Sequence, residues 1–179
     1  MRILLPCLCL SFLCLCLAPT LNAQNLKAFS GTWRIDPDQV TEKAVPVKNP
    51  PSDAPLMPPP PPSDHKYTLE HIVEDGNVMK ISGGEAGTTA VYTIDPSGKQ
   101  VSDPIPDAPG CVRTASTHWK DEKLVTNWEM KRDGQTFMHG TDTRSLSADG
   151  KQILERSIES PVHRAEIRLV MARTAEPGK

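Results

Sequence analysis

Histidine is the residue of this chain best suited to bind a metal or move a proton, and its spacing favours neither. The five histidines are His65, His71, His118, His139 and His163. Ligands that share a strand typically recur at i and i+2, and those on a helix at i and i+4; no pair of these histidines has either spacing. We therefore expect scattered surface or core histidines, with no metal and no cofactor.

Nucleophilic catalysis needs an activated Ser, Cys or Thr with a base and an orienting group beside it. The chain has no Gly-x-Ser-x-Gly elbow, and Cys111 lies beside Val112 and Arg113 without a surrounding signature. The Gly-rich stretch 83–87 lacks the Lys-Ser/Thr that completes a phosphate loop, and it precedes an expected strand, so it predicts a hairpin tip. No residue argues for an enzyme, although the pattern leaves that question open.

Large aromatic and apolar side chains at alternate positions are the better candidates, and they point to binding. Successive side chains of a strand project to opposite faces, so alternate residues share a face. Around residue 128 the alternating set is Leu124, Thr126, Trp128 and Met130. Around residue 69 it is Tyr67, Leu69, His71 and Val73. From these two sets we predict that Tyr67, Leu69, Trp128 and Met130 line a ligand site.

A further set of candidate inward positions is small or polar. Its members are Thr114, Ser116, Thr126, Thr141, Thr143 and Ser157. They predict either a polar-lined cavity or a wet outer face. The sequence does not choose between the two, because a register slip of one residue exchanges the faces of a strand.

The elements that must position these side chains are short strands. Apolar and polar residues alternate most clearly at 124–131 and 164–171, and turn pairs such as Asp75-Gly76 and Asp133-Gly134 separate successive runs. Helical periodicity is lacking. The spacing predicts an all-β fold, a single up-and-down antiparallel β-barrel of about eight to ten strands. A β-sandwich is the alternative.

Proline interrupts this pattern between the first and second expected strands. Residues 37–62 form a Pro-rich excursion that ends in the unbroken run Pro58–Pro62. Such a run adopts an extended polyproline II rod without backbone donors, so we expect it to stay out of the sheet. A second Pro-rich loop spans 103–109. Both loops read as stiff connections, and the alternative is recognition of a protein partner through an aromatic-lined groove.

The N-terminus predicts export. Arg2 precedes an apolar stretch from Ile3 to Leu17, and Pro19 and Ala23 supply a cleavage signal. We expect 1–23 to be a removable signal peptide and 24–179 one domain, secreted or periplasmic, with no membrane span in the mature form.

The mature composition narrows the range of partners. Four of the five cysteines lie in 1–23, which leaves Cys111 and excludes an internal disulfide. Removing Arg2 from the 20 basic residues leaves 19 against 22 acidic ones, so nucleic acid is not an expected partner.

The run Phe29-Ser-Gly31-Thr-Trp33 resembles the Gly-x-Trp opening of lipocalins and fatty-acid-binding proteins. The stretches 31–37 and 147–151 are also similar to small exported bacterial proteins with a lipocalin-like domain. The resemblance implies that Gly31 and Trp33 close the barrel base beneath a stacked arginine, for which Arg173 is the candidate and Arg168 the reserve. The chain departs from the family at the lid, where the Pro-rich excursion replaces helices, and the pattern identifies no Arg/Tyr pair for a fatty-acid carboxylate.

Together these patterns favour an exported lipocalin-like binding protein for a small molecule such as an amphipathic ligand. The alternative is an exported interaction or inhibitor module that uses its Pro-rich loops. Because one fold hosts many functions, the first hypothesis depends on analogy with the family as well as on the residues.

Overall fold

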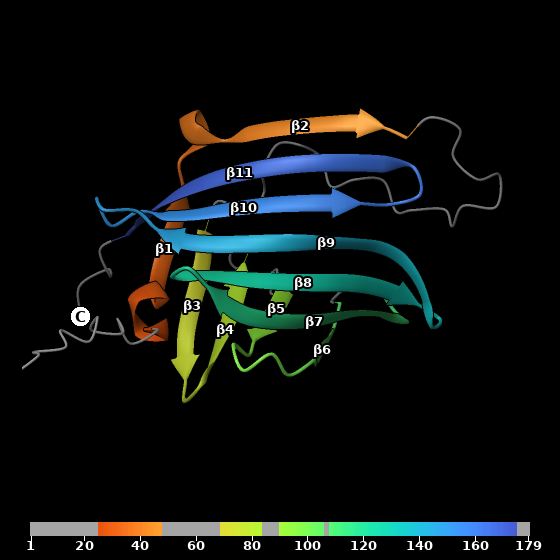
Figure 1. Ribbon diagram of the computed structural model, residues 1–179, viewed down its shortest axis with the longest axis horizontal. Coiled ribbons are helices and arrows are strands. Elements are labelled where there is room, and N and C mark those ends of the chain that lie inside the picture. Colours follow the sequence, from red (N-terminus) through yellow and green to blue (C-terminus); the bar gives the residue numbers. More distant parts are fainter. Residues whose placement is uncertain (1–24, 48–68, 84–89, 106–107, 175–179) are drawn as a thin grey trace, which may run out of the picture.

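The computed structural model describes residues 25–47, 69–83, 90–105 and 108–174, and it is built almost wholly of strands (Figure 1). Two 3₁₀ turns, η1 (Leu26–Phe29) and η2 (Pro37–Gln39), lie near the N-terminal end of this part. The strands are β1 Gly31–Ile35, β2 Thr41–Pro46, β3 Leu69–Asp75, β4 Val78–Gly83, β5 Ala90–Ile94, β6 Val101–Pro104, β7 Cys111–Lys120, β8 Lys123–Arg132, β9 Gln135–Leu146, β10 Gln152–Glu159 and β11 His163–Arg173.

These strands form one antiparallel sheet that curls into a nearly closed up-and-down barrel. Ten of them follow the order β5-β4-β3-β1-β11-β10-β9-β8-β7-β6. Figure 1 shows the long strands β7 to β11 crossing the shorter β1, β3, β4 and β5 at a steep angle. The all-β, up-and-down prediction is confirmed. None of the helices in the described part is long and apolar enough to cross a membrane.

The first and last strands join at β1 and β11, where Trp33 pairs with Arg173. The barrel remains open between β5 and β6, the two ends of the strand order. A side chain links these two strands, because the Thr93 amide donates to Asp103 Oδ2 at 3.0 Å.

The apolar core fills the end of the barrel nearest η1. Its fully buried members include Trp33, Met79, Leu124, Leu154 and Met171. The Trp33 indole donates to the Phe29 carbonyl at 2.7 Å, which ties η1 across the barrel base. The Arg173 guanidinium lies over the Trp33 ring, 4.7 Å from its centroid, and donates to the Ala28 carbonyl at 2.7 Å.

The prediction that the Pro-rich excursion 37–62 is a connection outside the sheet is wrong for its first part. Residues 41–46 form β2, which pairs antiparallel with β11 from Thr41–Arg168 to Pro46–His163. A strand is tolerated here because 41–46 contains one proline, at its last position, where the loss of a donor interrupts little of the ladder. The signal peptide 1–23 and the proline run 58–62 lie outside the described residues, and they stay predictions.

Candidate functional site

Above the apolar base, the inward face of the barrel carries a layer of paired charges. Arg144 of β9 donates two hydrogen bonds to Glu70 of β3, Nη1 to Oε2 at 2.7 Å and Nη2 to Oε1 at 3.1 Å. Both side chains are largely buried, with 5% and 15% of their surface exposed. This bidentate pair ties together walls of the barrel that lie 74 residues apart in the sequence.

A second ion pair lies in the next layer. Arg156 of β10 donates to both oxygens of Asp142 on β9, each at 2.7 Å. The Trp128 indole donates to the same Asp142 Oδ1 at 2.9 Å. Asp142 is therefore fully paired, although the Arg156 side chain retains 33% exposure. Solvent thus reaches the inward face of the sheet at β10.

The third inward cation, Arg113 of β7, is paired more loosely. Its guanidinium lies 4.8 Å from the centre of the Tyr92 ring of β5, and its Nη1 is 3.9 Å from Asp103 Oδ2 of β6. Arg113 is 5% exposed, and its Nη1 makes no hydrogen bond. A buried guanidinium nitrogen without a hydrogen bond is costly, and the ion pair with Asp103 at 3.9 Å compensates Nη1 only in part.

The pKa values of two buried acids, Glu70 and Asp142, are lowered, which favours their charged form. Burial alone would raise the pKa of Glu70, but the charge and hydrogen bonds of Arg144 outweigh it, and the pKa lies below the ordinary value. The pKa of Asp142 is lowered in the same way, against burial, by the charge and hydrogen bonds of Arg156. Burial lowers the pKa of Arg113, whereas the neighbouring acids Asp142 and Asp103 oppose that effect.

Two of the predicted lining residues lie beside Arg113. Met130 is its direct cross-strand neighbour, and Trp128 pairs with Ala115 on the same inward face. Trp128 is 5% exposed. The structure therefore brings Trp128 and Met130 together with a buried cation that the sequence patterns did not select.

The other two lining candidates are not brought to this place. Tyr67 lies outside the described residues. Successive residues of β3 face opposite sides of the sheet. Ile72, on the face of Glu70, is 2% exposed, whereas Val73, on the face of Leu69, is 61% exposed. The face of β3 that carries Leu69, His71 and Val73 is thus the outer one. The apolar side chains of β3 are divided between its two faces, so alternation does not indicate which face is buried. The inward Glu70 is stabilised by Arg144, a partner that the local sequence does not reveal.

The remaining structural candidates lie together at the base. Gly31 has a φ of +130°, and a Cβ atom at this position would lie 3.7 Å from Arg173 Nε. Trp33 is completely buried beneath that arginine.

Cys111 is a free, buried thiol whose sulfur accepts a hydrogen bond from Arg132 Nε at 3.2 Å.

A β-bulge re-aims one aromatic side chain of β9. The register between β8 and β9 shifts between Met130 and Lys131, so that Phe137 is the extra residue. Phe137 is 7% exposed, whereas the flanking Thr136 is exposed. The bulge therefore turns Phe137 into the interior, where the Arg132 guanidinium lies 5.7 Å from its ring centre.

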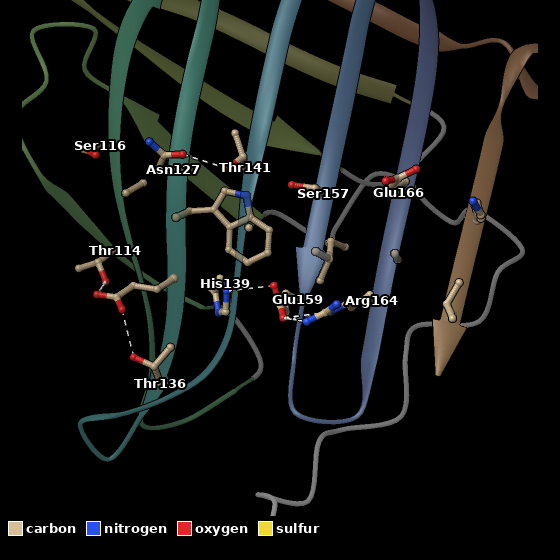
Figure 2. Close-up of a pocket in the computed structure, with 18 of the residues that line it drawn as sticks. Thr114, Ser116, Asn127, Thr136, His139, Thr141, Ser157, Glu159, Arg164 and Glu166 are labelled. Atoms are coloured by element: carbon tan, nitrogen blue, oxygen red, sulfur yellow. Dashed lines mark hydrogen bonds and ion pairs between the residues drawn. The ribbon is translucent and has the colours of Figure 1, made fainter. Parts of the chain in front are cut away.

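The small polar residues resolve into two groups. Thr126 is buried on the inward face, where its hydroxyl is 2.8 Å from that of Thr117. The others alternate with buried residues and lie on the outer face. Thr114, Ser116, Thr141 and Ser157 border an outer hollow of about 940 Å³ (Figure 2). Thr143 borders a smaller hollow of about 420 Å³.

Sequence reasoning missed the charged residues of the interior. They are Glu70, Asp103, Arg113, Asp142, Arg144 and Arg156. A signal existed, because Asp142 and Arg144 are two residues apart on β9, and Gln152, Leu154 and Arg156 share one face of β10. Charged residues at the same alternate positions of a strand as buried apolar residues indicate an ionic layer inside a barrel. Among the described residues, no group of three or more His, Cys, Asp or Glu side chains is arranged to hold a metal ion.

Comparisons with known proteins assign no family to this chain. No family model and no curated protein matches this chain. Among solved structures it is similar to the REP1-NXSQ fatty acid transporter, with 11% identity and a TM-score of 0.48, over 83% of this chain and 98% of that protein.

Proposed function

We propose that this chain is an exported, lipocalin-like binding protein that holds a small amphipathic ligand with an acidic head inside its barrel. The observation that carries the proposal is Arg113, a buried inward-facing cation whose Nη1 makes no hydrogen bond. Its cross-strand neighbour Met130 and the nearby Trp128 supply apolar surface for the rest of the ligand. Export rests on the signal-like sequence 1–23.

Three features support the interior as the place of binding. The barrel is open between β5 and β6, where Arg113, Tyr92 and Asp103 meet. Arg144 and Arg156 each donate two hydrogen bonds to a carboxylate, although Arg144 Nε is also without a partner, whereas the nearest carboxylate oxygen to Arg113 Nη1 lies 3.9 Å away. A ligand carboxylate at Arg113 would gain a charge-assisted hydrogen bond in a place sheltered from water.

Native mass spectrometry of the mature protein, purified from its own host, tests the proposal by detecting a bound small molecule. In parallel, the anionic probe 1-anilinonaphthalene-8-sulfonate is titrated by fluorescence and displaced with dodecanoate. We expect Arg113→Met to weaken probe binding about tenfold or more, because a hydrogen bond to a charged group contributes about 1.5–3 kcal/mol. Arg113→Lys, which keeps the charge, should retain part of the affinity.

Arg164→Met is the matched control, since Arg164 is an exposed arginine of the outer face. Far-UV circular dichroism verifies that each variant is folded. The proposal is contradicted if the mature protein carries no small molecule and if Arg113→Met binds the probe as tightly as the parent protein does. The alternative function through Pro-rich loops stays a prediction, because 48–68 and 106–107 lie outside the described residues.

A further inference from the structure

The outer face of the barrel carries an organised polar surface that the interior site does not use. Two rows of side chains run across six neighbouring strands, from β7 to β2. The first row is Ser116, Asn127, Thr141, Ser157, Glu166 and Lys43, each directly opposite the next. The second row is Thr114, Glu129, His139, Glu159, Arg164 and Val45. We call these two rows the outer groove.

The outer groove is both long and hollowed. Every residue of the two rows borders the hollow of about 940 Å³. Figure 2 shows Ser116, Asn127, Thr141, Ser157 and Glu166 lying in a line across the strands. Because neighbouring strands lie about 4.8 Å apart, six strands give a track of roughly 24 Å. This length suits a chain-like ligand that lies across the strands.

The charges along the outer groove cancel locally. Glu159 accepts from Arg164 Nη2 at 2.6 Å and lies 3.7 Å from His139 Nε2. Glu129 pairs with Lys131 at 2.6 Å. Glu166 is directly opposite Lys43. Three carboxylates thus face three cations, which favours neither a polyanion nor a polycation.

The remaining groups of the groove are hydroxyls and one amide. The Thr141 hydroxyl donates to Asn127 Oδ1 at 2.9 Å, which leaves the Asn127 amide hydrogens for an outside acceptor. Ser116 and Ser157 make no side-chain hydrogen bond within the described part of the chain. The exposed side chain of Val45 is the one large apolar group in the two rows, so the pockets that an apolar peptide side chain requires are lacking in these rows.

We propose that the outer groove binds a neutral glycan chain, laid across β7 to β2 and held by hydrogen bonds to Asn127, Thr141 and the serines beside them. Sugar hydroxyls donate and accept hydrogen bonds, as serine and threonine hydroxyls and the asparagine amide do. Successive sugars of the chain can therefore form hydrogen bonds with polar side chains of successive strands. Two or more weak contacts of this kind add along the chain.

The groove binds the glycan without cleaving it. Glycoside hydrolysis needs one carboxylic acid kept protonated near neutral pH. Hydrogen bonds from Lys131 and Thr136 instead hold the pKa of Glu129 below its ordinary value. Glu159 is in turn engaged by Arg164.

The test titrates the full mature protein with neutral hexasaccharides of glucose and of N-acetylglucosamine, followed by amide chemical shifts. We expect shifts at Ser116, Asn127, Thr141 and Ser157 for at least one sugar, and about tenfold weaker binding by the double variant Asn127→Ala/Thr141→Val. That size corresponds to the loss of two neutral hydrogen bonds. Ser145→Ala, on the same face of β9 but bordering neither hollow, is the matched control.

The proposal is overturned if no hexasaccharide shifts these amides, if Ser145→Ala weakens binding as much as the double variant, or if dextran sulfate binds in place of the neutral sugars. Mass spectrometry of the recovered sugar detects cleavage, which would overturn binding without hydrolysis. Arg113 does not border the hollow, so Arg113→Met should weaken binding of the anionic probe and leave the sugar titration as it is, which separates failure of this proposal from failure of the interior site.

Discussion

At the scale of single residues, Gly31 has a backbone conformation that other residues rarely adopt. Its φ is +130°, whereas a Cβ atom would meet Arg173 only at an ordinary contact distance of 3.7 Å. Gly31→Ala should therefore destabilise the protein through backbone strain rather than through a clash, by about 1–3 kcal/mol in urea unfolding.

Gly83→Ala is the control for Gly31→Ala, because Gly83 has no positive φ and its Cβ would lie 3.8 Å from the Leu69 carbonyl. Its effect on the free energy of unfolding should be small. Equal losses in the two variants would show that the Gly31 conformation carries no special cost.

The pair Glu70–Arg144 predicts a different kind of loss. Glu70→Gln leaves a guanidinium that is 5% exposed without its counter-charge, and should cost about 3–5 kcal/mol of unfolding free energy. Replacing both members, in Glu70→Leu/Arg144→Leu, removes the buried charges together and should cost less than the single change. A double-mutant cycle completed by the single variants Glu70→Leu and Arg144→Leu, followed by urea unfolding, measures the coupling. A double variant less stable than Glu70→Gln would contradict this explanation.

These residues also show how far local patterns can be read. The Gly-x-Trp resemblance pointed to Gly31, Trp33 and Arg173, and the structure places these three in contact. Glu70 alternates with Leu69 and His71, and a charged residue opposite a predicted lining face is expected to face water, whereas the structure turns it inward. Its partner Arg144 is 74 residues away, and no local window of sequence contains both.

At the scale of elements, alternation with period two was sufficient to predict the fold class. It worked best for β8 and β11, whose turn residues and faces are unambiguous. It failed for β2, because proline content dominated the interpretation of 37–62 and concealed the strand at 41–46. β2 pairs with residues 163–168, the N-terminal half of the long strand β11, which would otherwise lack a neighbour on that edge.

This position of β2 predicts local rather than global unfolding. Lys43→Pro/Ala44→Pro removes two successive backbone donors and should detach β2 from β11, while the β1–β11 closure at Trp33 remains. Hydrogen exchange should speed up in 41–46 and in 163–168, with β8 and β9 still protected. Lys43→Ala is the control. Loss of protection throughout the barrel would show instead that β2 is required for closure.

At the scale of the whole molecule, the polar interior and the outer groove exist only when distant strands are brought into register. Asn127 and Thr141 become neighbours through the β8–β9 pairing, and Ser157 joins them through β10. The sequence left open whether such residues line a cavity or a wet face, since that depends on the register of the whole sheet. The structure places Thr126 inside and its companions outside.

The ionic layer makes the stability of the whole barrel sensitive to acid. The pKa values of Glu70 and Asp142 are lower in the folded protein than their ordinary values of 4.5 and 3.8, which approximate the unfolded chain. The unfolded state therefore binds protons first as the pH falls. The stabilisation is fully present above the unfolded pKa values and is lost as the pH falls through the folded ones.

We therefore expect the free energy of unfolding to change little between neutral pH and about pH 5, and to decline below the ordinary value of 4.5 for Glu70. Urea titrations at a series of pH values measure this decline. Exposed acid–base pairs such as Asp75–Lys80 are screened by salt, whereas the buried layer is screened much less, so the decline should persist in high salt. The variant Glu70→Leu/Arg144→Leu should show a shallower decline, because one of the two buried acids with a lowered pKa is gone. An acid profile identical in this variant and the parent would place the sensitivity elsewhere in the molecule.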